Sequence, residues 1–266
     1  MKSLNGSELA GFIKERHASQ VRELKNQGIQ PKLAIVQVKD DPVINTYVRL
    51  KQSYGTDVGV EVEQHKVQQS DSTEVIQSLN KDQSVHGVIV QLPLTDPSET
   101  EKIVNLVTPD KDVDALGKDA KFEPATPMAI LWLLGGYDID LKGKEVLLIG
   151  RGKLVGAPLE KILKTSRVNV EVVDRSTPDL QGATLKADVI ITATGSPAIL
   201  YPDMIKQGAV VVDAGVASEE GKTVGDLSPE VHQRDDLTIT PEKGGVGPLT
   251  VCALFENVIR ATSKTG

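Results

Sequence analysis

Apolar and polar residues follow two alternating patterns along the chain. Short runs rich in valine and isoleucine predict buried β-strands, and longer segments with an apolar residue every three or four positions predict helices. We expect strands at residues 32–38, 60–67, 87–94, 145–150, 169–174, 188–195 and 209–216. Because ten or more residues separate these strands, the connections are expected to be helical crossovers between parallel strands. The predicted fold class is α/β.

The pattern changes between Pro109 and Gly143. The stretch "PDKDVDALGKDAKFEPATP" predicts a charged loop, and the helical segment "MAILWLLGGY" that follows it ends at two glycines. We therefore place a domain boundary near residue 140, with residues 1–140 and 250–266 in one domain and residues 141–249 in the other. A long loop at a domain junction is more often functional than idle.

Composition and charge narrow the class of protein. A length of 266 residues allows two domains of ordinary size or one large α/β domain, and 39% hydrophobic with 25% charged residues is typical of globular proteins. No apolar run reaches the roughly 18 residues of a membrane helix, and the N-terminus predicts an amphipathic helix rather than a secretory signal. A net charge of −7 without a basic block argues against nucleic acid. We expect a cytoplasmic protein that binds neither membranes nor nucleic acids.

The cysteine and histidine residues do not suggest a metal centre. Cys252 is the only cysteine, which excludes an intrachain disulfide and a cysteine-cluster site, and its apolar neighbours predict a buried helix face. The histidines are not at metal-ligand spacing; they are His17, His65, His86 and His232. No metal site is predicted.

A glycine-rich turn follows the strand "EVLLIG". In "VLLIGRGKLVGAPLEKIL" a buried strand, a turn with Gly150, Gly152 and Gly156, and a helix come in that order. Glycines let the backbone approach a pyrophosphate, and the first N–H groups of the helix favour its negative charge. Asp174 ends the next strand, as expected for a dinucleotide-binding unit. Dinucleotide binding is the prediction; a tight turn that serves only chain packing is the alternative.

The same region gives conflicting signals about which dinucleotide is bound. Asp174 is placed where a carboxylate would hold the ribose hydroxyls of NAD and repel the additional phosphate of NADP. Arg151 and Arg175 flank that position and are able to bind the phosphate, although an exposed arginine is often only a surface charge. The residues alone leave both cofactors open.

A tyrosine and a lysine one turn apart mark a second candidate site. In "VINTYVRLKQSYG", Tyr47 and Lys51 project from the same face of a predicted helix. A lysine among apolar groups has a lowered pKa and is able to transfer protons. The alternative is an ordinary surface lysine beside a surface tyrosine. The apolar neighbours expected around this pair are Val43, Ile44, Val48 and Leu50.

Polar residues elsewhere in the first domain support the catalytic alternative. Gln91 ends a buried strand and is followed by "LPL", and ligand groups gather at the carboxyl ends of strands in α/β sheets. Asp112 and Asp114 follow at alternating positions in the junction loop.

Six motifs occur in a specific order: "YVRLK", "VQLPL", "PDKDVD", "ATP" before a helix, "GRGKLVGAP" and "GGVGPLT". This set closely resembles the bifunctional methylenetetrahydrofolate dehydrogenase/cyclohydrolase family, from about residue 3 to residue 262. The resemblance implies oxidation of methylene-tetrahydrofolate with a nicotinamide cofactor, then hydrolysis of the methenyl product to formyl-tetrahydrofolate. It also implies a folate-binding catalytic domain, a Rossmann-type dinucleotide-binding domain, and an active-site cleft between these α/β domains.

The resemblance assigns roles to individual residues. Lys51 matches the family's catalytic lysine, Tyr47 the tyrosine beside the pterin, Gln91 the glutamine that bonds the lysine, and Asp114 the aspartate that anchors the pterin. Substrate contacts are also implied for Leu92, Pro93, Gly247 and Pro248. The turn from Gly244 to Thr250 resembles the family's closing loop, although a simple turn that begins a helix would use the same glycines.

The implied cofactor is NADP, with NAD as the alternative because of Asp174. The implied partner is a small-molecule folate, and a homodimer is the default for the family. The residues expected to contact the cofactor are Gly150, Arg151, Gly152, Val155, Gly156, Asp174, Arg175, Ser176, Thr194 and Gly195.

Several positions depart from the family pattern. Gly152 replaces the serine of the usual "GRS", Asp174 replaces a neutral or histidine residue, and Ala115 replaces the glycine that usually follows "VD". Ile44 replaces a small polar residue, and the segment 116–124 is shorter than usual. We expect the chemistry to be retained. The alternatives are a monofunctional dehydrogenase and a catalytically silent folate- or nucleotide-binding relative.

Overall fold

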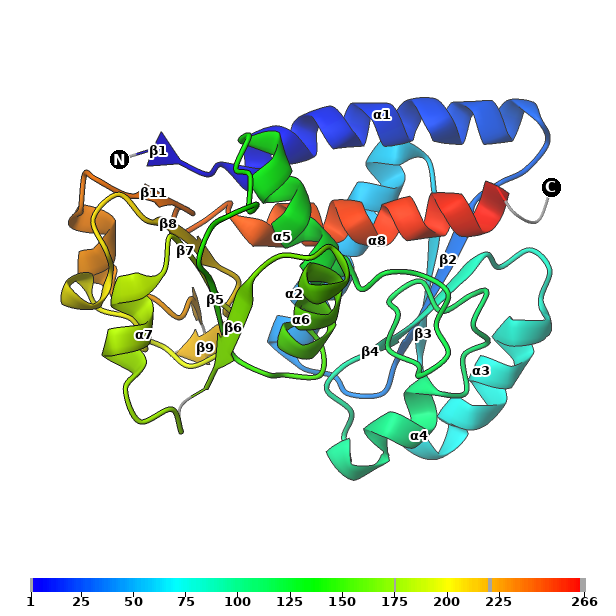
Figure 1. Cartoon of the computed structure of the whole chain (residues 1–266). Helices are drawn as coiled ribbons and strands as arrows, with labels where there is room; N and C mark the ends of the chain where they lie inside the picture. The colour runs from blue at the N-terminus through cyan, green and yellow to red at the C-terminus, as the bar shows by residue number, and fades with distance from the viewer. Residues whose placement is uncertain (1, 175, 220–221, 264–266) are drawn as a thin grey trace. The chain divides into compact units, whose positions relative to one another are not determined.

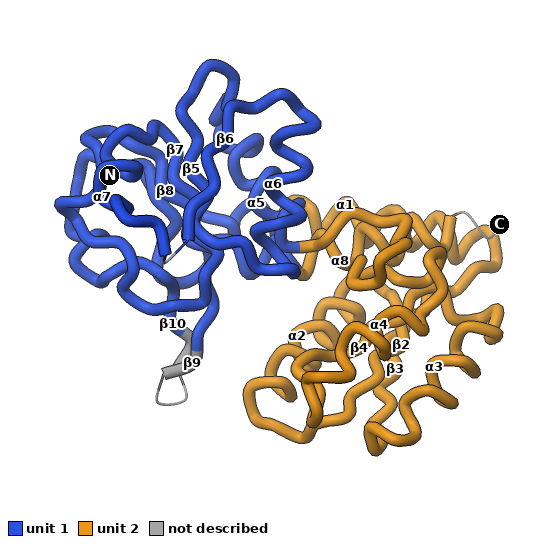
Figure 2. The backbone as a smooth tube through the Cα atoms, turned by 60° about the horizontal axis from the view of Figure 1, so that its bottom comes forward, with its two compact units in different colours: residues 1–10, 126–250 blue, residues 11–125, 251–266 orange. Residues whose placement is uncertain are grey.

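The structure is a computed structural model that describes residues 2–174, 176–219 and 222–263 (Figure 1). Contacts divide the chain into two units, which Figure 2 shows in blue and orange. Unit 1 contains residues 1–10 and 126–250, and unit 2 contains residues 11–125 and 251–266. This division changes units near residue 126, and the boundary near residue 140 remains a prediction.

Unit 2 is built on a three-stranded parallel sheet. Strands β2 (Lys32–Gln37), β3 (Glu61–Lys66) and β4 (Gly87–Gln91) lie in the order β3-β2-β4. Every residue of β4 is buried and β2 is buried except at Lys32, which is typical of parallel strands covered on both faces. The helices that lie wholly within this unit are α2 (Pro42–Val58), α3 (Ser72–Lys81) and α4 (Thr100–Val104), with short 3-10 turns η1 (Gln69–Asp71) and η2 (Pro97–Glu99).

Unit 1 is built on a six-stranded parallel sheet in the order β1-β11-β8-β7-β5-β6. Its strands are β1 (Lys2–Ser3), β5 (Val146–Ile149), β6 (Val170–Val173), β7 (Val189–Thr192), β8 (Val210–Asp213) and β11 (Thr238–Ile239). A separate antiparallel pair joins β9 (Ala217–Glu219) and β10 (Lys222–Val224). The other elements are α5 (Ala125–Gly136), α6 (Gly156–Thr165), α7 (Leu180–Lys186), η3 (Pro202–Met204) and η4 (Pro229–Gln233).

Two long helices, α1 (Gly6–Asn26) and α8 (Val246–Ser263), contribute residues to both units. Within unit 2 they meet α2 at a buried polar group. The ring nitrogens of fully buried His17 lie 2.9 Å from the Tyr54 hydroxyl and 3.0 Å from a carboxylate oxygen of Glu256. The Tyr54 hydroxyl is in turn 3.4 Å from Cys252 Sγ, and Cys252 is fully buried as predicted. These contacts fix α2, the helix that carries Tyr47 and Lys51.

The predicted fold class is confirmed: both main sheets are parallel, and the chain is α/β. All seven predicted strands are present as β2 to β8. Those predicted at 87–94, 188–195 and 209–216 end earlier, at Gln91, Thr192 and Asp213. The residues predicted beyond these ends belong to the loops that follow the strands.

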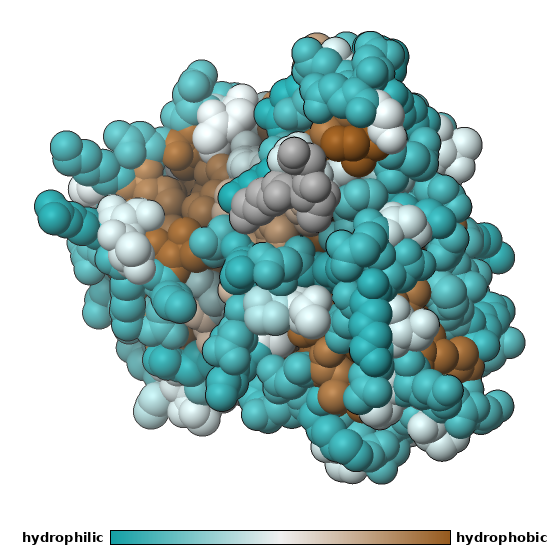
Figure 3. Space-filling view, turned by 90° about the vertical axis from the view of Figure 1, so that its right-hand side faces the viewer, coloured by the Kyte–Doolittle hydropathy of each residue, from teal (hydrophilic) through white to brown (hydrophobic). Residues whose placement is uncertain are grey.

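Large apolar side chains on the surface are scattered. The face in Figure 3 is mostly hydrophilic, with hydrophobic side chains in separate areas. Single exposed apolar residues are normal for a folded chain and do not by themselves mark a binding surface. They are Phe12, Val43, Leu50, Leu154, Leu185, Tyr201 and Val216. Among the described residues, no helix is long and apolar enough to cross a membrane.

Candidate active site

In unit 2, Lys51 and Gln91 form the centre of the predicted catalytic group. Helix α2 begins at Pro42 with Asp41 as its N-cap, and this helix presents Tyr47 and Lys51 one turn apart. Lys51 Nζ donates a hydrogen bond to Gln91 Oε1 over 2.8 Å. Gln91 ends the fully buried strand β4, and its Nε2 donates to the Leu92 carbonyl over 3.1 Å. The two bonds fix the orientation of the amide, so its oxygen faces the lysine.

Asp114 completes this group through its charge. Burial lowers the pKa of the Lys51 ammonium, and the nearby Asp114 carboxylate opposes that shift. Burial likewise raises the pKa of the Asp114 carboxyl, and the Lys51 charge opposes it. A lowered lysine pKa increases the share of neutral amine, which is the form that accepts a proton.

The two aspartates of "PDKDVD" have different environments. Asp112 is buried, and its carboxylate accepts hydrogen bonds from the N–H groups of Gly117, over 2.7 Å, and Leu116, over 3.4 Å. Asp112 therefore closes the loop that follows it, whereas Asp114 interacts with Lys51. Ala115, which directly follows Asp114, has a left-handed backbone with φ of 56°. A side chain costs roughly 1–2 kcal/mol in that conformation, which explains why glycine is usual here.

The expectation that four apolar residues surround Tyr47 and Lys51 is wrong for two of them. Ile44 and Val48 are buried, but Val43 is 36% exposed and Leu50 is 50% exposed. Val43 and Leu50 are seven residues apart and so share one face of α2, which points away from the core. The burial of Ile44 explains why an apolar residue is tolerated at this departure from the family pattern.

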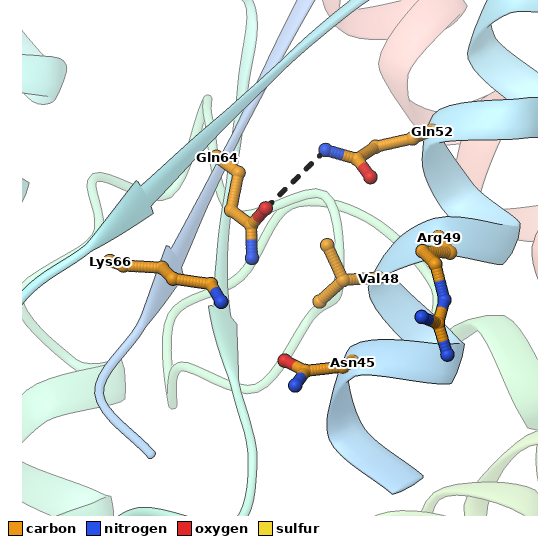
Figure 4. A pocket seen from close by; sticks show the side chains of 6 residues that line it. All are labelled: Asn45, Val48, Arg49, Gln52, Gln64 and Lys66. Carbon is orange, nitrogen blue, oxygen red and sulfur yellow. Dashed lines mark hydrogen bonds between the residues drawn. The ribbon is translucent and has the colours of Figure 1, made fainter. Parts of the chain in front are cut away.

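A network of amide side chains behind α2 was not predicted. Gln37, the last residue of β2, donates from Nε2 to Asn45 Oδ1 over 2.8 Å and accepts from Gln64 Nε2 over 2.6 Å. Gln37 is paired in register with Gln91 in the adjacent strand. The sequence could have predicted Gln37 as a site residue, because it ends a buried strand as Gln91 does. Beside this network is a pocket, shown in Figure 4, lined by Asn45, Val48, Arg49, Gln52, Gln64 and Lys66.

The other predicted substrate residues lie in different units. Leu92, half-buried, and Pro93, exposed, follow Gln91 directly and are joined by a cis peptide bond. Gly247 and Pro248 lie in the first turn of α8 and belong to unit 1.

In unit 1, the predicted strand, glycine turn and helix are β5, residues 150–155 and α6. Gly150 has φ of 115°, and a Cβ on it would lie 2.5 Å from the Ala193 carbonyl oxygen. A Cβ on Gly156 would lie 2.1 Å from the Gly150 oxygen, whereas one on Gly152 would meet nothing within 4 Å. Two glycines are thus required by close backbone approach, and the third has open space beside it just before α6, whose N-terminal N–H groups are of the kind that bind phosphate.

The strand order places this turn at a topological switch point. The chain runs from β5 to β6 on one side and then to β7 on the other side of β5. Ligands bind at the carboxyl ends of the strands at such a point. Gly150 follows β5, while Thr194 and Gly195 follow β7, and the Thr194 methyl group would be 3.3 Å from a Cβ on Gly150. Gly150 and Thr194, both predicted to contact the cofactor, are therefore neighbours although 44 positions of sequence (150 to 194) separate them.

The residues after β6 form the expected polar rim. The Asp174 carboxylate accepts hydrogen bonds from the Ser176 N–H over 2.8 Å and its hydroxyl over 2.5 Å, which lowers the pKa of Asp174. Arg151 donates to the Val172 carbonyl over 2.7 Å, and its positive charge also lowers the pKa of Asp174. Val155 directly precedes α6. Arg175 lies outside the described residues.

Two models of one family match the chain. The catalytic domain of tetrahydrofolate dehydrogenase/cyclohydrolase matches residues 4–114, and the NAD(P)-binding domain matches residues 124–266. The chain belongs to the tetrahydrofolate dehydrogenase/cyclohydrolase family. The resemblance found in the sequence is thereby confirmed.

Individual members of the tetrahydrofolate dehydrogenase/cyclohydrolase family match over nearly their full length. The bifunctional protein FolD of Cenarchaeum symbiosum is 38% identical over 275 residues, covering 98% of each chain. The crystal structure of the bifunctional enzyme FolD from Campylobacter jejuni has a TM-score of 0.93 and 36% identity, covering 99% of each chain. FolD from Trypanosoma brucei, solved with NADP and an inhibitor, has a TM-score of 0.91 and 27% identity, with coverage of 98% and 97%.

Within the tetrahydrofolate dehydrogenase/cyclohydrolase family match, the two candidate regions fall in different domains. The catalytic-domain match contains Lys51, Gln91 and Asp114, and the NAD(P)-binding match contains the glycine turn and the residues after β7. A nicotinamide cofactor therefore belongs to the second domain.

Proposed function

We propose that this chain oxidises methylene-tetrahydrofolate to methenyl-tetrahydrofolate with a nicotinamide cofactor and hydrolyses the product to formyl-tetrahydrofolate. The observation that carries the proposal is the hydrogen bond from Lys51 to Gln91 beside Asp114, in a chain that matches both family domains. This arrangement supplies one amine of lowered pKa, an amide that orients it, and a carboxylate.

In the hydrolytic step, water adds to the methenyl carbon, and a proton must leave the attacking oxygen. Lys51 as neutral amine accepts that proton, and Gln91 holds the amine in place. The Lys51 ammonium then returns a proton to one ring nitrogen, the bond between the carbon and that nitrogen breaks, and the remaining hydroxyl proton leaves to solvent as the formyl carbonyl forms, so one proton is released overall. Asp114 binds the pterin, and Tyr47 offers a ring face one turn away on α2.

The oxidative step depends on positioning more than on acid or base. A nicotinamide cofactor bound here would supply the hydride acceptor for the methylene carbon, and the adjacent substrate nitrogen would stabilise the resulting cation. The glycine turn and the α6 N-terminus would hold the pyrophosphate, and the residues after β7 lie beside that turn at the switch point.

Two assays on the purified chain test this function. Methylene-tetrahydrofolate with NADP or NAD is expected to increase nicotinamide absorbance, and methenyl-tetrahydrofolate is expected to hydrolyse faster than in buffer. A flat nicotinamide signal with both cofactors would favour a silent binding relative. Dehydrogenase activity without accelerated hydrolysis would favour a monofunctional enzyme, which the intact Lys51–Gln91 contact argues against.

We propose NADP as the preferred cofactor. Arg151 lies beside the end of β6, where the ribose phosphate would be placed, and the Trypanosoma brucei relative was solved with NADP. Asp174 opposes this preference, because its ionised carboxylate would repel the same phosphate.

Replacing Asp174 by serine is expected to shift the cofactor preference toward NADP. Removing one negative charge near the phosphate is expected to raise the NADP to NAD ratio of kcat/KM by about fivefold. Initial rates with both cofactors measure the ratio. Asp203→Ser, an exposed aspartate in the same unit, is the control and should leave it unchanged. A ratio that stays the same or falls in Asp174→Ser would show that the carboxylate does not face the phosphate.

We also propose that the chain forms a homodimer through β3. Among the described strands, β3 pairs with β2 alone, so its other edge presents free backbone groups. Antiparallel pairing of two copies about the middle of β3 would place Glu61 of one copy opposite Lys66 of the other. Sedimentation equilibrium should give twice the mass of one chain. The mass of a single chain at micromolar concentration would contradict the proposal.

A further inference from the structure

A buried aspartate in unit 1 holds the loop that follows β7. Asp226 is fully buried, although it lies outside every predicted site. Its Oδ2 accepts the N–H of Thr194 over 2.7 Å, and its Oδ1 accepts the N–H of Ser196 over 2.9 Å. Each carboxylate oxygen therefore binds one backbone N–H of the loop that contains Gly195.

Asp226 is itself held on both sides. Its N–H donates to the Asp213 carboxylate, with distances of 3.1 and 2.9 Å to the two oxygens, and its carbonyl accepts the N–H of Ile199 over 2.8 Å. Asp213 ends β8, and Leu227 forms a bridge with Leu200. The backbone of Asp226 is thus bonded to the end of β8, and its carboxylate binds the Thr194–Ser196 loop.

The loop held by Asp226 packs against the glycine turn at the switch point. The Ala193 carbonyl and the Thr194 methyl group lie against Gly150, because a Cβ on Gly150 would be 2.5 Å from the Ala193 oxygen and 3.3 Å from the Thr194 methyl carbon. A displacement of this loop would therefore change the space beside the glycine turn. Because backbone atoms of this loop are packed directly against Gly150, even a small shift of the loop would move the glycine turn.

We propose that Asp226 is a positioning residue for the nicotinamide cofactor, acting through the Thr194–Ser196 loop. The inference rests on the proposed function only for the identity of the cofactor. An asparagine at this position has the same shape, but it carries one acceptor oxygen and an NH₂ group in place of two oxygens. One of the two loop N–H groups would then face a donor, and the loop would have to move.

The experiment compares wild type with Asp226→Asn. The dissociation constant of NADPH, measured by fluorescence titration, is expected to rise about tenfold or more, and the KM for NADP should rise with it. The dehydrogenase kcat should fall by about threefold at most, and methenyl-tetrahydrofolate hydrolysis, which uses no nicotinamide, should stay within about twofold. An unchanged NADPH affinity, or an equal loss of both activities, would overturn the proposal.

Asp236→Asn is the matched structural control. Asp236 belongs to the same unit and accepts hydrogen bonds from Arg234 and from the Gly208 N–H, but it precedes β11 at the amino ends of the strands. This variant should lower the melting temperature and leave the NADPH affinity unchanged. If it weakened NADPH binding as much as Asp226→Asn does, the effect of Asp226 would be general destabilisation and the proposal would fail.

One further measurement does not depend on the folding of the variant. Amide hydrogen exchange in wild type should be slow at both Thr194 and Ser196, and rapid exchange at these amides would contradict the proposal even if Asp226→Asn does not fold. The titration also separates this inference from the proposed function. A wild-type chain that binds NADPH and fails to oxidise methylene-tetrahydrofolate would refute the function, while the comparison of NADPH affinities would still decide the role of Asp226.

Discussion

Replacing Lys51 by methionine is expected to reduce methenyl-tetrahydrofolate hydrolysis by about a thousandfold, which is within the usual contribution of a general base. Methionine has a similar length and is apolar, so it fills the same space, without an amine, on the face of α2 that also carries buried Ile44 and Val48. Gln91 loses its partner but keeps its bond to the Leu92 carbonyl. Hydrolysis rates and a titration with NADPH measure the effect, and NADPH affinity should change by less than about twofold because the glycine turn belongs to the other unit.

Two companion variants make the Lys51 result specific. Lys81→Met changes an exposed lysine of α3 and should hydrolyse as fast as wild type. Lys51→Arg keeps the positive charge, but a guanidinium is not deprotonated near neutral pH and cannot accept the proton, so it should be nearly as inactive as Lys51→Met. An active arginine variant would contradict a proton-transfer role. Equal losses of hydrolysis and of NADPH affinity would contradict the assignment to the folate site.

The pH dependence of hydrolysis follows from the same group. Burial lowers the pKa of Lys51, so the neutral amine becomes populated at a lower pH than for a lysine in water. The rate should rise with pH through this lowered pKa and level off above it. Lys51→Met should lose that rising limb, since the group that titrates is gone.

The parts of the structure that the sequence predicted are those that depend on local patterns. Buried parallel strands are continuous apolar runs, so β2 to β8 were found, and the ends of β4 and β5 located Gln91 and Gly150. The contact between Lys51 and Gln91 crosses 40 positions, and the pattern predicted it only through the resemblance to the family.

The missed features depend on contacts that a one-dimensional pattern does not contain. Val43 and Leu50 are apolar, but the direction of α2 relative to its sheet exposes them. Asp226 reaches the loop after β7 across 32 positions in one bond and 30 in the other. Its motif, an aspartate after a glycine, is common in turns, so nothing local distinguishes a buried carboxylate that accepts two backbone N–H groups from a solvated one.

The turn after β5 has a requirement that a substitution tests directly. Gly156→Ala adds a methyl group whose carbon would lie 2.1 Å from the Gly150 carbonyl oxygen and 2.8 Å from the carbonyl carbon. Both are backbone atoms, so the clash cannot be relieved by a side-chain rotation, and the turn must open. We expect a loss of about 2–3 kcal/mol in the free energy of unfolding, as for other overpacked sites, and at least about a tenfold rise in the KM for NADP.

Gly11→Ala is the matched control for Gly156→Ala, because it makes the same change where there is room. Gly11 is exposed within α1, and an added Cβ meets nothing within 4 Å. Alanine is favoured over glycine inside a helix, so this variant should be more stable by about 0.5–1 kcal/mol, with both activities unchanged. Denaturant unfolding and initial rates measure both variants. Wild-type NADP affinity in Gly156→Ala would contradict the proposal that the turn holds the pyrophosphate. A turn that opens without a change in affinity does not contact the cofactor.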